Sequence, residues 1–263
     1  MENLFSNRTT AITRLLESQR TDPNVNHHLS RTRNLVKFPL MNVASSFGNP
    51  REKIIKFFDA VQNGNVALVD EFIKAGVDPS VNKNFAIRSS SKYGYLGVVN
   101  RLLDDPRVNP AADYNYAIRK ASKYGYIDVV ERLLADVRVN PAADYNYAIR
   151  KASEFGHIDV VNRLLADERV DPSVDHNYAI RMASARGHLD VVNRLIADPR
   201  VDPRDYNNYA LGAALQNGHV DVVNRLRSDP RIGNVVVGGS RKTRKTIRQV
   251  GKRQTKSKSK SKS

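Results

Sequence analysis

Hydrophobic and small residues recur along this chain at helical spacing, in paired segments that a glycine separates. In one such unit Ile118, Ala121 and Ser122 occupy positions i, i+3 and i+4, and small side chains there suit two closely packed helices. Gly125 follows, where a left-handed C-cap is expected to end a short first helix. A second apolar pattern over residues 127–134 predicts a longer second helix. The unit is therefore a helical hairpin.

This hairpin repeats with a step of 31 residues. The segment Asn-Tyr-Ala-Ile-Arg, or a close variant of it, begins at Asn84, Asn115, Asn146, Asn177 and Asn208. The glycine recurs at Gly64, Gly94, Gly125, Gly156, Gly187 and Gly218, with one step of 30. Because a single hairpin cannot cover its own apolar face, such a period predicts about six stacked units in an elongated array.

Polar residues mark the expected ends of each helix. Asn115 is placed to cap the first helix, and Pro141 is placed to stop the second. Acidic and basic residues four apart on the second helix predict ion pairs on its surface. These pairs are Asp128 with Arg132, Asp159 with Arg163, Asp190 with Arg194 and Asp221 with Arg225.

The ends of the array depart from the repeat. Asn49 and Pro50 fit an N-cap and a first helical residue, so the array is expected over residues 50–237. Arg227 replaces the Leu or Ile of earlier units, as expected of a terminal unit that faces water. Residues 1–49 are interpreted as a degenerate half repeat, centred on 11–28, and an irregular linker.

The segment from Gly156 to Leu165, Gly-His-Ile-Asp-Val-Val-Asn-Arg-Leu-Leu, resembles the second helix of an ankyrin repeat. Val139-Asn140 resembles the end of that family's loop. The resemblance covers about residues 50–237 and implies an all-α, ankyrin-type helical solenoid of about six helix-turn-helix repeats. The repeat sequences, with Asn-Tyr-Ala-Ile-Arg and the Asp-Pro-Arg-Val-Asp-Pro segment at residues 198–203, are more particularly similar to divergent ankyrin-repeat proteins encoded by large DNA viruses of protists.

Two departures from the family pattern stand out. The usual ankyrin repeat has 33 residues, so the connecting loop is expected to be shorter here. The tetrad Thr-Pro-Leu-His that opens the usual first helix is replaced by Tyr116, Ala117, Ile118 and Arg119. The hydrogen bonds of the usual tetrad are therefore not expected.

Composition narrows the class of protein further. The chain has no cysteine, which excludes disulfides and thiolate sites and fits a reducing compartment. Its apolar runs are too short for a membrane span or a signal-peptide core. We therefore expect an intracellular protein of the cytoplasm or nucleus, not secreted, and a monomer.

No pattern of an enzyme or cofactor site is present. His157, His188 and His219 recur, but stacked helices lie roughly 8–10 Å apart, which is too far for one zinc ion held at about 2 Å. No phosphate loop or nucleophile elbow occurs. We predict no catalytic residue, no metal site and no cofactor.

Arginines also recur, on the first helices and in the loops. A continuous cationic stripe is able to follow a phosphate backbone. Acids interleave with both series, however, so mutual neutralisation is the favoured interpretation. The first series is Arg88, Arg119, Arg150 and Arg181, and the second is Arg107, Arg138, Arg169, Arg200 and Arg231.

Partner recognition is expected where the repeats differ from one another. The positions before each glycine vary, and Tyr93, Tyr124 and Phe155 put three aromatic residues in consecutive units. By resemblance to ankyrin repeats, this end of the first helix faces the concave groove. The alternative is that these rings only shield neighbouring helices. The full set of candidates adds Lys92, Lys123, Arg186, Tyr114, Tyr145 and His176.

The last 26 residues have a different chemistry. Residues 238–263 contain 11 Lys and Arg and no acid, whereas residues 50–237 contribute only +2 of the net charge of +16. Such a tail is expected to be disordered and to act in nuclear import, in contact with nucleic acid or another polyanion, or only as a solvated end. Its basic clusters are Arg241, Lys242, Arg244 and Lys245, and then Lys252 and Arg253.

The leading hypothesis is a non-enzymatic scaffold that binds a host or viral protein on the concave face of the array, with a basic tail for nuclear targeting or polyanion contact. The alternative makes the tail primary, in a nucleic-acid-associated protein that uses the array as a handle. A ubiquitin-ligase adaptor would need an F-box-like segment, and Phe38-Pro39-Leu40 is too little to predict one.

Overall fold

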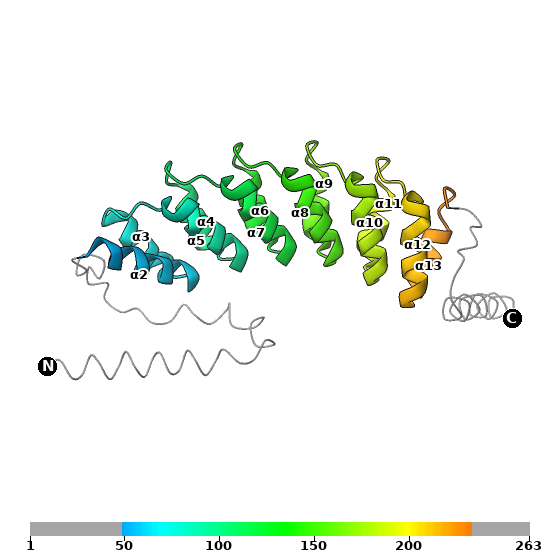
Figure 1. Cartoon of the computed structure of the whole chain (residues 1–263), viewed down its shortest axis with the longest axis horizontal. Coiled ribbons are helices and arrows are strands. Elements are labelled where there is room, and N and C mark those ends of the chain that lie inside the picture. The colour runs from blue at the N-terminus through cyan, green and yellow to red at the C-terminus, as the bar shows by residue number, and fades with distance from the viewer. Residues whose placement is uncertain (1–48, 233–263) are drawn as a thin grey trace, which may run out of the picture. The chain divides into compact units, whose positions relative to one another are not determined.

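The structure is a computed structural model that describes residues 49–232, and these residues form twelve helices in six antiparallel pairs and no strand (Figure 1). The predicted all-α solenoid of six repeats is thereby confirmed. The first helices are α2 (Pro50–Gln62), α4 (Val81–Tyr93), α6 (Ala112–Tyr124), α8 (Ala143–Glu154), α10 (Val174–Arg186) and α12 (Asp205–Asn217). The second helices are α3 (Val66–Lys74), α5 (Leu96–Leu103), α7 (Ile127–Leu134), α9 (Ile158–Leu165), α11 (Leu189–Ile196) and α13 (Val220–Arg227).

The helix pairs lie side by side in a row. From α4 onward, each first helix packs most extensively on the first helices of its neighbours. Each second helix packs mainly on the first helix of its own repeat and less on the second helices of its neighbours. In each repeat a few apolar side chains fill the space between the pairs. In the third repeat these are Ala117, Ile118, Ala121, Val130 and Leu133, all fully buried. The core is therefore a continuous column built from one set of positions.

Two separate features of the structure require a glycine after the first helix, as the third repeat shows. Gly125 has φ 79°, in the left-handed region, and the backbone N–H of Tyr126 donates to the carbonyl of Ala121 at 3.0 Å, as in a Schellman cap. A Cβ at Gly125 would lie 2.5 Å from Nδ1 of His157, in the next repeat. Both the backbone conformation and the neighbouring ring therefore exclude a side chain here.

The predicted lengths and stops of the helices need correction. The second helix is not the longer one, because α6 has 13 residues and α7 has 8. Pro141 does not stop α7, which ends at Leu134, well before the proline. Asp136 organises the turn instead, since its carboxylate accepts from the backbone N–H of Arg138 at 3.0 Å.

Two features expected near the ends of the array are present, whereas its predicted end at residue 237 lies outside the described residues. Asn49 caps α2 by accepting a hydrogen bond from the N–H of Arg51 at 2.9 Å, with Pro50 as the first helical residue. Arg227 is half-buried at the end of α13, where Leu134, Leu165 and Ile196 are buried in the preceding repeats. Among residues 49–232, no helix has both the length and the hydrophobicity to cross a bilayer. The half repeat expected at 11–28 lies outside the described residues.

Candidate partner-binding face

A short left-handed turn opens five of the six first helices. In α6 the residues Asp113, Tyr114 and Asn115 have φ values of 56°, 54° and 58°. Asp and Asn adopt this conformation more readily than other residues with a side chain, which accounts for two of the three positions. The turn directs Tyr114 and its counterpart Tyr145 into solvent, with 79% and 80% of each residue exposed. His176 occupies the same place in α10 and is also exposed.

The recurring asparagine of this turn joins one repeat to the next. Asn115 Oδ1 accepts a hydrogen bond from the backbone N–H of Asn140 in the following repeat at 2.8 Å. The prediction that Asn115 caps its own helix was therefore wrong, because its side chain reaches across the stack. The same contact joins Asn84 to Asn109 at 2.7 Å, Asn146 to Asp171 at 2.9 Å and Asn177 to Asp202 at 3.0 Å.

The arginines of the first helices hold the left-handed turns together. Arg150 donates from Nε to the carbonyl of Tyr145 at 2.8 Å and from Nη2 to the carbonyl of Asp144 at 3.2 Å. Its Nη1 pairs with Asp175 of the next repeat at 3.2 Å. Arg88 pairs with Asp113 and Arg119 with Asp144 in the same way. The predicted neutralisation is thereby confirmed for these three arginines, which do not form a free cationic stripe.

The loop arginines are engaged in the same manner. Arg138 makes two hydrogen bonds to Asp136, at 2.9 and 2.7 Å, and donates to the carbonyl of Val108 in the preceding repeat at 2.9 Å. Hydrogen bonds from the Arg138 guanidinium hold the pKa of Asp136 below its ordinary value. The same pairing occurs for Arg107 with Asp105, Arg169 with Asp167, Arg200 with Asp198 and Arg231 with Asp229.

Two of the four arginines expected to form ion pairs within the second helices make contacts between repeats instead. Arg132 donates from Nε to Asn100 Oδ1 at 3.1 Å, and Arg225 donates to Asn193 Oδ1 at 2.9 Å. Both asparagines lie one repeat earlier. Asn100, the acceptor for Arg132, is also more buried than Asp128, the partner expected from the sequence. Within the described residues, the pairs Asp128–Arg132, Asp159–Arg163, Asp190–Arg194 and Asp221–Arg225 are not formed.

The recurring histidines also reach back by one repeat. His188 Nε2 lies 3.0 Å from the carbonyl oxygen of Glu154, so this nitrogen carries the proton and donates. Burial lowers the pKa of His188. His157 and His219 make the equivalent contacts, with the carbonyls of Lys123 and Ala185. No group of three or more metal-binding side chains occurs among residues 49–232.

The aromatic residues before each glycine lie at the ends of three consecutive first helices. Tyr93, Tyr124 and Phe155 are 46%, 41% and 36% exposed. A lysine accompanies them: Lys92 Nζ is 4.9 Å from the centre of the Tyr93 ring, and Lys123 Nζ is 5.3 Å from Tyr124 and 5.4 Å from Phe155. We call these five residues, with Lys120, the first-helix face. Each ring also contacts Tyr95, Tyr126 or His157 of its own repeat. The three rings therefore cover neighbouring side chains and are at the same time partly open to solvent.

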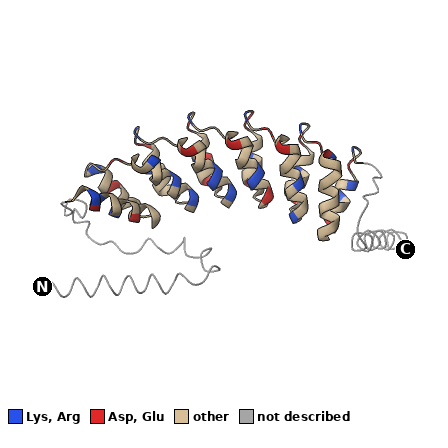
Figure 2. Ribbon diagram, viewed as in Figure 1, with Lys and Arg blue, Asp and Glu red and all other residues tan. Residues whose placement is uncertain are grey.

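The face changes character at its far end. Arg186 lies over the ring of Phe155 at 4.8 Å and forms an ion pair with Glu154. Glu154 is buried, which alone would raise its pKa, but hydrogen bonds from Lys151 and Tyr178 outweigh burial and lower it. In the ribbon of Figure 2, Lys and Arg positions are marked along α4, α6, α8 and α10, whereas the sequence of α12 contains neither residue. The three lysines of the first-helix face, Lys92, Lys120 and Lys123, all lie before Glu154 in the chain.

Comparison with known families accounts for this architecture. A family model described as ankyrin repeats, in three copies, matches residues 147–234. That segment is therefore similar in sequence to ankyrin repeats. The preceding helix pairs share their step, their glycine caps and their asparagine contacts, so the described array has an ankyrin-type fold throughout.

The similarity to individual known proteins is weaker than the similarity to the family model. An ankyrin repeat family protein from Legionella pneumophila, known from its X-ray structure, is similar at 19% identity and a TM-score of 0.38. The alignment covers 72% of this chain and 73% of that protein. No curated protein matches the sequence significantly.

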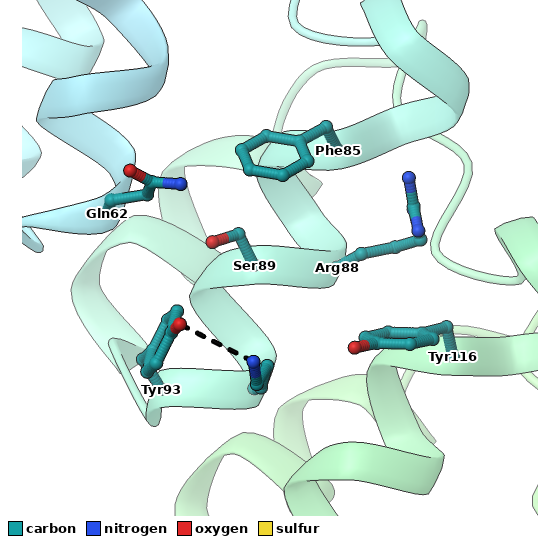
Figure 3. Close-up of a pocket in the computed structure, with 7 residues that line it drawn as sticks. Gln62, Phe85, Arg88, Ser89, Tyr93 and Tyr116 are labelled. Atoms are coloured by element: carbon teal, nitrogen blue, oxygen red, sulfur yellow. Dashed lines mark hydrogen bonds between the residues drawn. The ribbon is translucent and has the colours of Figure 1, made fainter.

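One feature of the ankyrin-type array escaped the sequence analysis. A cavity of about 120 Å³ lies beside Ser89 on α4 (Figure 3). In the next two repeats the position of Ser89 holds Lys120 and Lys151, whose long side chains reach the neighbouring tyrosine rings. The sequence does contain a sign of this cavity, because Ser89 stands at a repeat position that holds lysine in the next two repeats. The basic clusters Arg241–Lys245 and Lys252–Arg253 lie outside the described residues.

Proposed function

We propose that this chain is a non-enzymatic interaction module that binds a protein partner across the first-helix face, on the concave side of the array. The observation that carries the proposal is the row of Tyr93, Tyr124 and Phe155, half-exposed on consecutive helices. Aromatic residues of this kind supply much of the energy of protein interfaces, because they bury a large area at a small entropic cost.

The charges of the array support the same surface. The arginines Arg88, Arg119 and Arg150 and those of the loops are used in contacts between or within repeats. Lys92, Lys120 and Lys123 instead have no ion-pair partner in the described region and lie among aromatic rings. Side chains without a structural partner are the ones available to a ligand. This difference favours the first-helix face over the loops.

The left-handed turns offer a secondary contact. Tyr114, Tyr145 and His176 lie at the opposite end of the first helices and stand well into solvent. We propose that a large partner contacts both ends of the first helices, and that these three residues extend the interface at the N-terminal ends.

A triple variant tests the proposal. Tyr93→Ala, Tyr124→Ala and Phe155→Ala, combined, should fold normally and weaken partner binding by at least tenfold, since exposed rings contribute little to the core. The matched control changes Asp128, Asp159 and Asp190, which are exposed on the second helices, to Asn. Peptides from a random display library, selected on the full-length chain, serve as ligands. Equal affinities for wild type and the triple variant would show that the face is not the binding site.

For residues 238–263 we propose nuclear targeting or polyanion contact, on the basis of their composition. Deletion of this tail should leave peptide binding intact and remove salt-sensitive retention on DNA or RNA. Loss of peptide binding would favour the alternative in which the tail is primary. The similarity to repeat proteins of large DNA viruses stays a prediction, with a host or viral protein as the partner.

A further inference from the structure

The cavity beside Ser89 exists because one repeat lacks a side chain that the next two provide. Between the rings of Tyr116 and Tyr147 lies Lys120, whose Nζ is 5.1 Å from the first ring centre and 5.5 Å from the second. Lys151 fills the following interval, at 5.8 Å from Tyr147 and 5.2 Å from Tyr178. One repeat earlier the rings are Phe85 and Tyr116, and the residue between them is Ser89. The interval is therefore empty.

Several polar groups at this cavity have hydrogen-bonding capacity to spare. Ser89 is only 6% exposed, yet its hydroxyl makes no hydrogen bond in the described structure, and it points into the cavity in Figure 3. The Ser89 hydroxyl is accessible from the cavity and is not sealed in the core, so a ligand in the cavity has a hydrogen-bonding group to bind there. Gln62 of α2 and Lys92 of α4 line the same space. Lys92 donates one long hydrogen bond, of 3.4 Å, to Tyr93 Oη and lies 4.9 Å from the centre of the Tyr93 ring.

The charge around the cavity is positive. The charged residues that line it are Arg88 and Lys92. Arg88 is fully engaged with Asp113 and with two backbone carbonyls, whereas Lys92 has no acidic partner among the described residues. A group that accepts hydrogen bonds from Ser89, Gln62 and Lys92 together must carry oxygen acceptors and negative charge. A carboxylate has both.

We propose that this cavity receives an aspartate or glutamate side chain from an acidic segment of the bound protein. The inference rests on the proposed function of the first-helix face and names the chemistry of the partner. The aromatic walls of Phe85, Tyr93 and Tyr116 accommodate apolar atoms next to the carboxylate. A nucleic acid fits less well, because the exposed rings already have lysines over them and so offer no free surface for base stacking.

The repeat spacing adds a second requirement. Lys123 occupies in the third repeat the position of Lys92 in the second, and stacked helices lie roughly 8–10 Å apart. An extended peptide rises about 3.3 Å per residue and covers that distance in about three residues. The partner segment is therefore expected to carry two acidic residues three positions apart, with apolar neighbours, the first acid at Ser89 and Lys92 and the second at Lys123.

Ser89→Lys provides the sharpest test, since it restores the residue that the array itself carries at Lys120 and Lys151. The variant should fold like the wild type and close the cavity. Met182→Lys makes the same change three repeats further along and is the matched control. Lys92→Gln is a second variant that keeps the cavity and removes its free charge. Thermal unfolding followed by circular dichroism verifies the fold of all three.

Random 12-residue peptides are selected on the full-length wild-type chain in physiological salt, with an excess of the free peptide 238–263 present to remove peptides held by the basic tail. The enriched peptides should share two acids three residues apart. Ser89→Lys and Lys92→Gln should weaken their binding by at least tenfold, and Met182→Lys by less than twofold. Oligothymidylate and a phosphoserine peptide should bind the wild type and Ser89→Lys equally.

The inference is overturned if the selection enriches basic or uncharged peptides, or no peptide at all. It is also overturned if the enriched peptides bind Ser89→Lys as tightly as the wild type. The same holds if the oligonucleotide or the phosphopeptide binds the wild type more tightly than Ser89→Lys. The two proposals fail separately. Peptides that lose affinity in the Tyr93, Tyr124 and Phe155 variant but not in Ser89→Lys would leave the binding face in place and refute only the acidic pocket.

Discussion

Asn115 Oδ1 accepts a hydrogen bond from the backbone N–H of Asn140, 25 residues later, and thereby ties the left-handed turn of one repeat to the loop of the next. The residue has two roles, since it also adopts φ 58°. Three substitutions separate them. Asn115→Asp keeps an acceptor, Asn115→Gly keeps only the backbone freedom, and Asn115→Ala keeps neither.

We expect Asn115→Ala to lower the free energy of unfolding by about 2 kcal/mol, from a lost hydrogen bond and a strained left-handed residue. Asn115→Gly should lose about 1 kcal/mol, and Asn115→Asp less than either. Urea unfolding measures all three. An alanine variant as stable as the aspartate variant would mean that the contact does not hold the repeats together.

Ser90 and Ser91 are adjacent on α4 and both fully buried, but they differ in hydrogen bonding. Ser90 Oγ donates to the carbonyl of Ala86 at 2.9 Å, whereas Ser91 Oγ has no partner. Ser91→Ala should therefore raise the free energy of unfolding by roughly 1 kcal/mol, because it removes an unsatisfied polar group. Ser90→Ala should be neutral or lower it by up to about 1 kcal/mol. The opposite order in urea unfolding would contradict this assignment.

The loop carboxylates make the array sensitive to acid. Hydrogen bonds from the paired arginines lower the pKa of Asp136, and likewise those of Asp105, Asp167, Asp198 and Asp229. A carboxyl whose pKa is lower in the folded state stabilises the fold above its unfolded pKa of about 3.9, and that stability is lost as the pH falls through the folded value. Urea unfolding should thus show a decline in stability below about pH 4.

Arg138→Gln isolates one of these pairs. It should reduce stability at neutral pH and flatten part of the acid dependence, because the largest cause of the lowered pKa of Asp136, the hydrogen bonds from the Arg138 side chain, is then absent. An unchanged slope of stability against pH in this variant would show that the pair does not contribute to the acid response.

His188 acts in a different pH range. Burial lowers its pKa in the folded state, so the unfolded chain binds the proton more tightly. Stability is complete above the unfolded pKa of about 6.5 and falls as the pH drops through it toward the folded value. His188→Tyr, the residue found at the equivalent positions Tyr95 and Tyr126, should remove this part of the dependence. A variant with the same loss of stability between pH 7 and pH 5 would refute the assignment to His188.

Much of the fold follows from local patterns in the sequence. The helical hairpin, the cap at Asn49 and the left-handed Gly125 depend on residues close together in the chain, where spacing and backbone preference decide. The role of Asn115 does not, since its partner is 25 residues away and an asparagine before a helix looks the same whether it caps that helix or not. Arg132 escaped prediction likewise, because Asp128 and Asn100 are both within its reach and only packing selects between them.

The candidate face was predicted in outline only. Variation before each glycine pointed to Tyr93, Tyr124 and Phe155, and the structure brings them together with Lys92 and Lys123 on neighbouring helices. The cavity depends on what is missing at Ser89, which becomes visible only when Lys120 and Lys151 are seen to fill the equivalent intervals.

Hydrogen–deuterium exchange of the full-length chain, alone and with a peptide from the selection, tests the central claim most directly. The account predicts slower exchange on binding at the C-terminal ends of α4, α6 and α8, which carry Tyr93, Tyr124 and Phe155. Exchange in the second helices α7, α9 and α11 should stay unchanged. Protection confined to those second helices, with none at the ends of α4, α6 and α8, would contradict the claim that the first-helix face binds the partner.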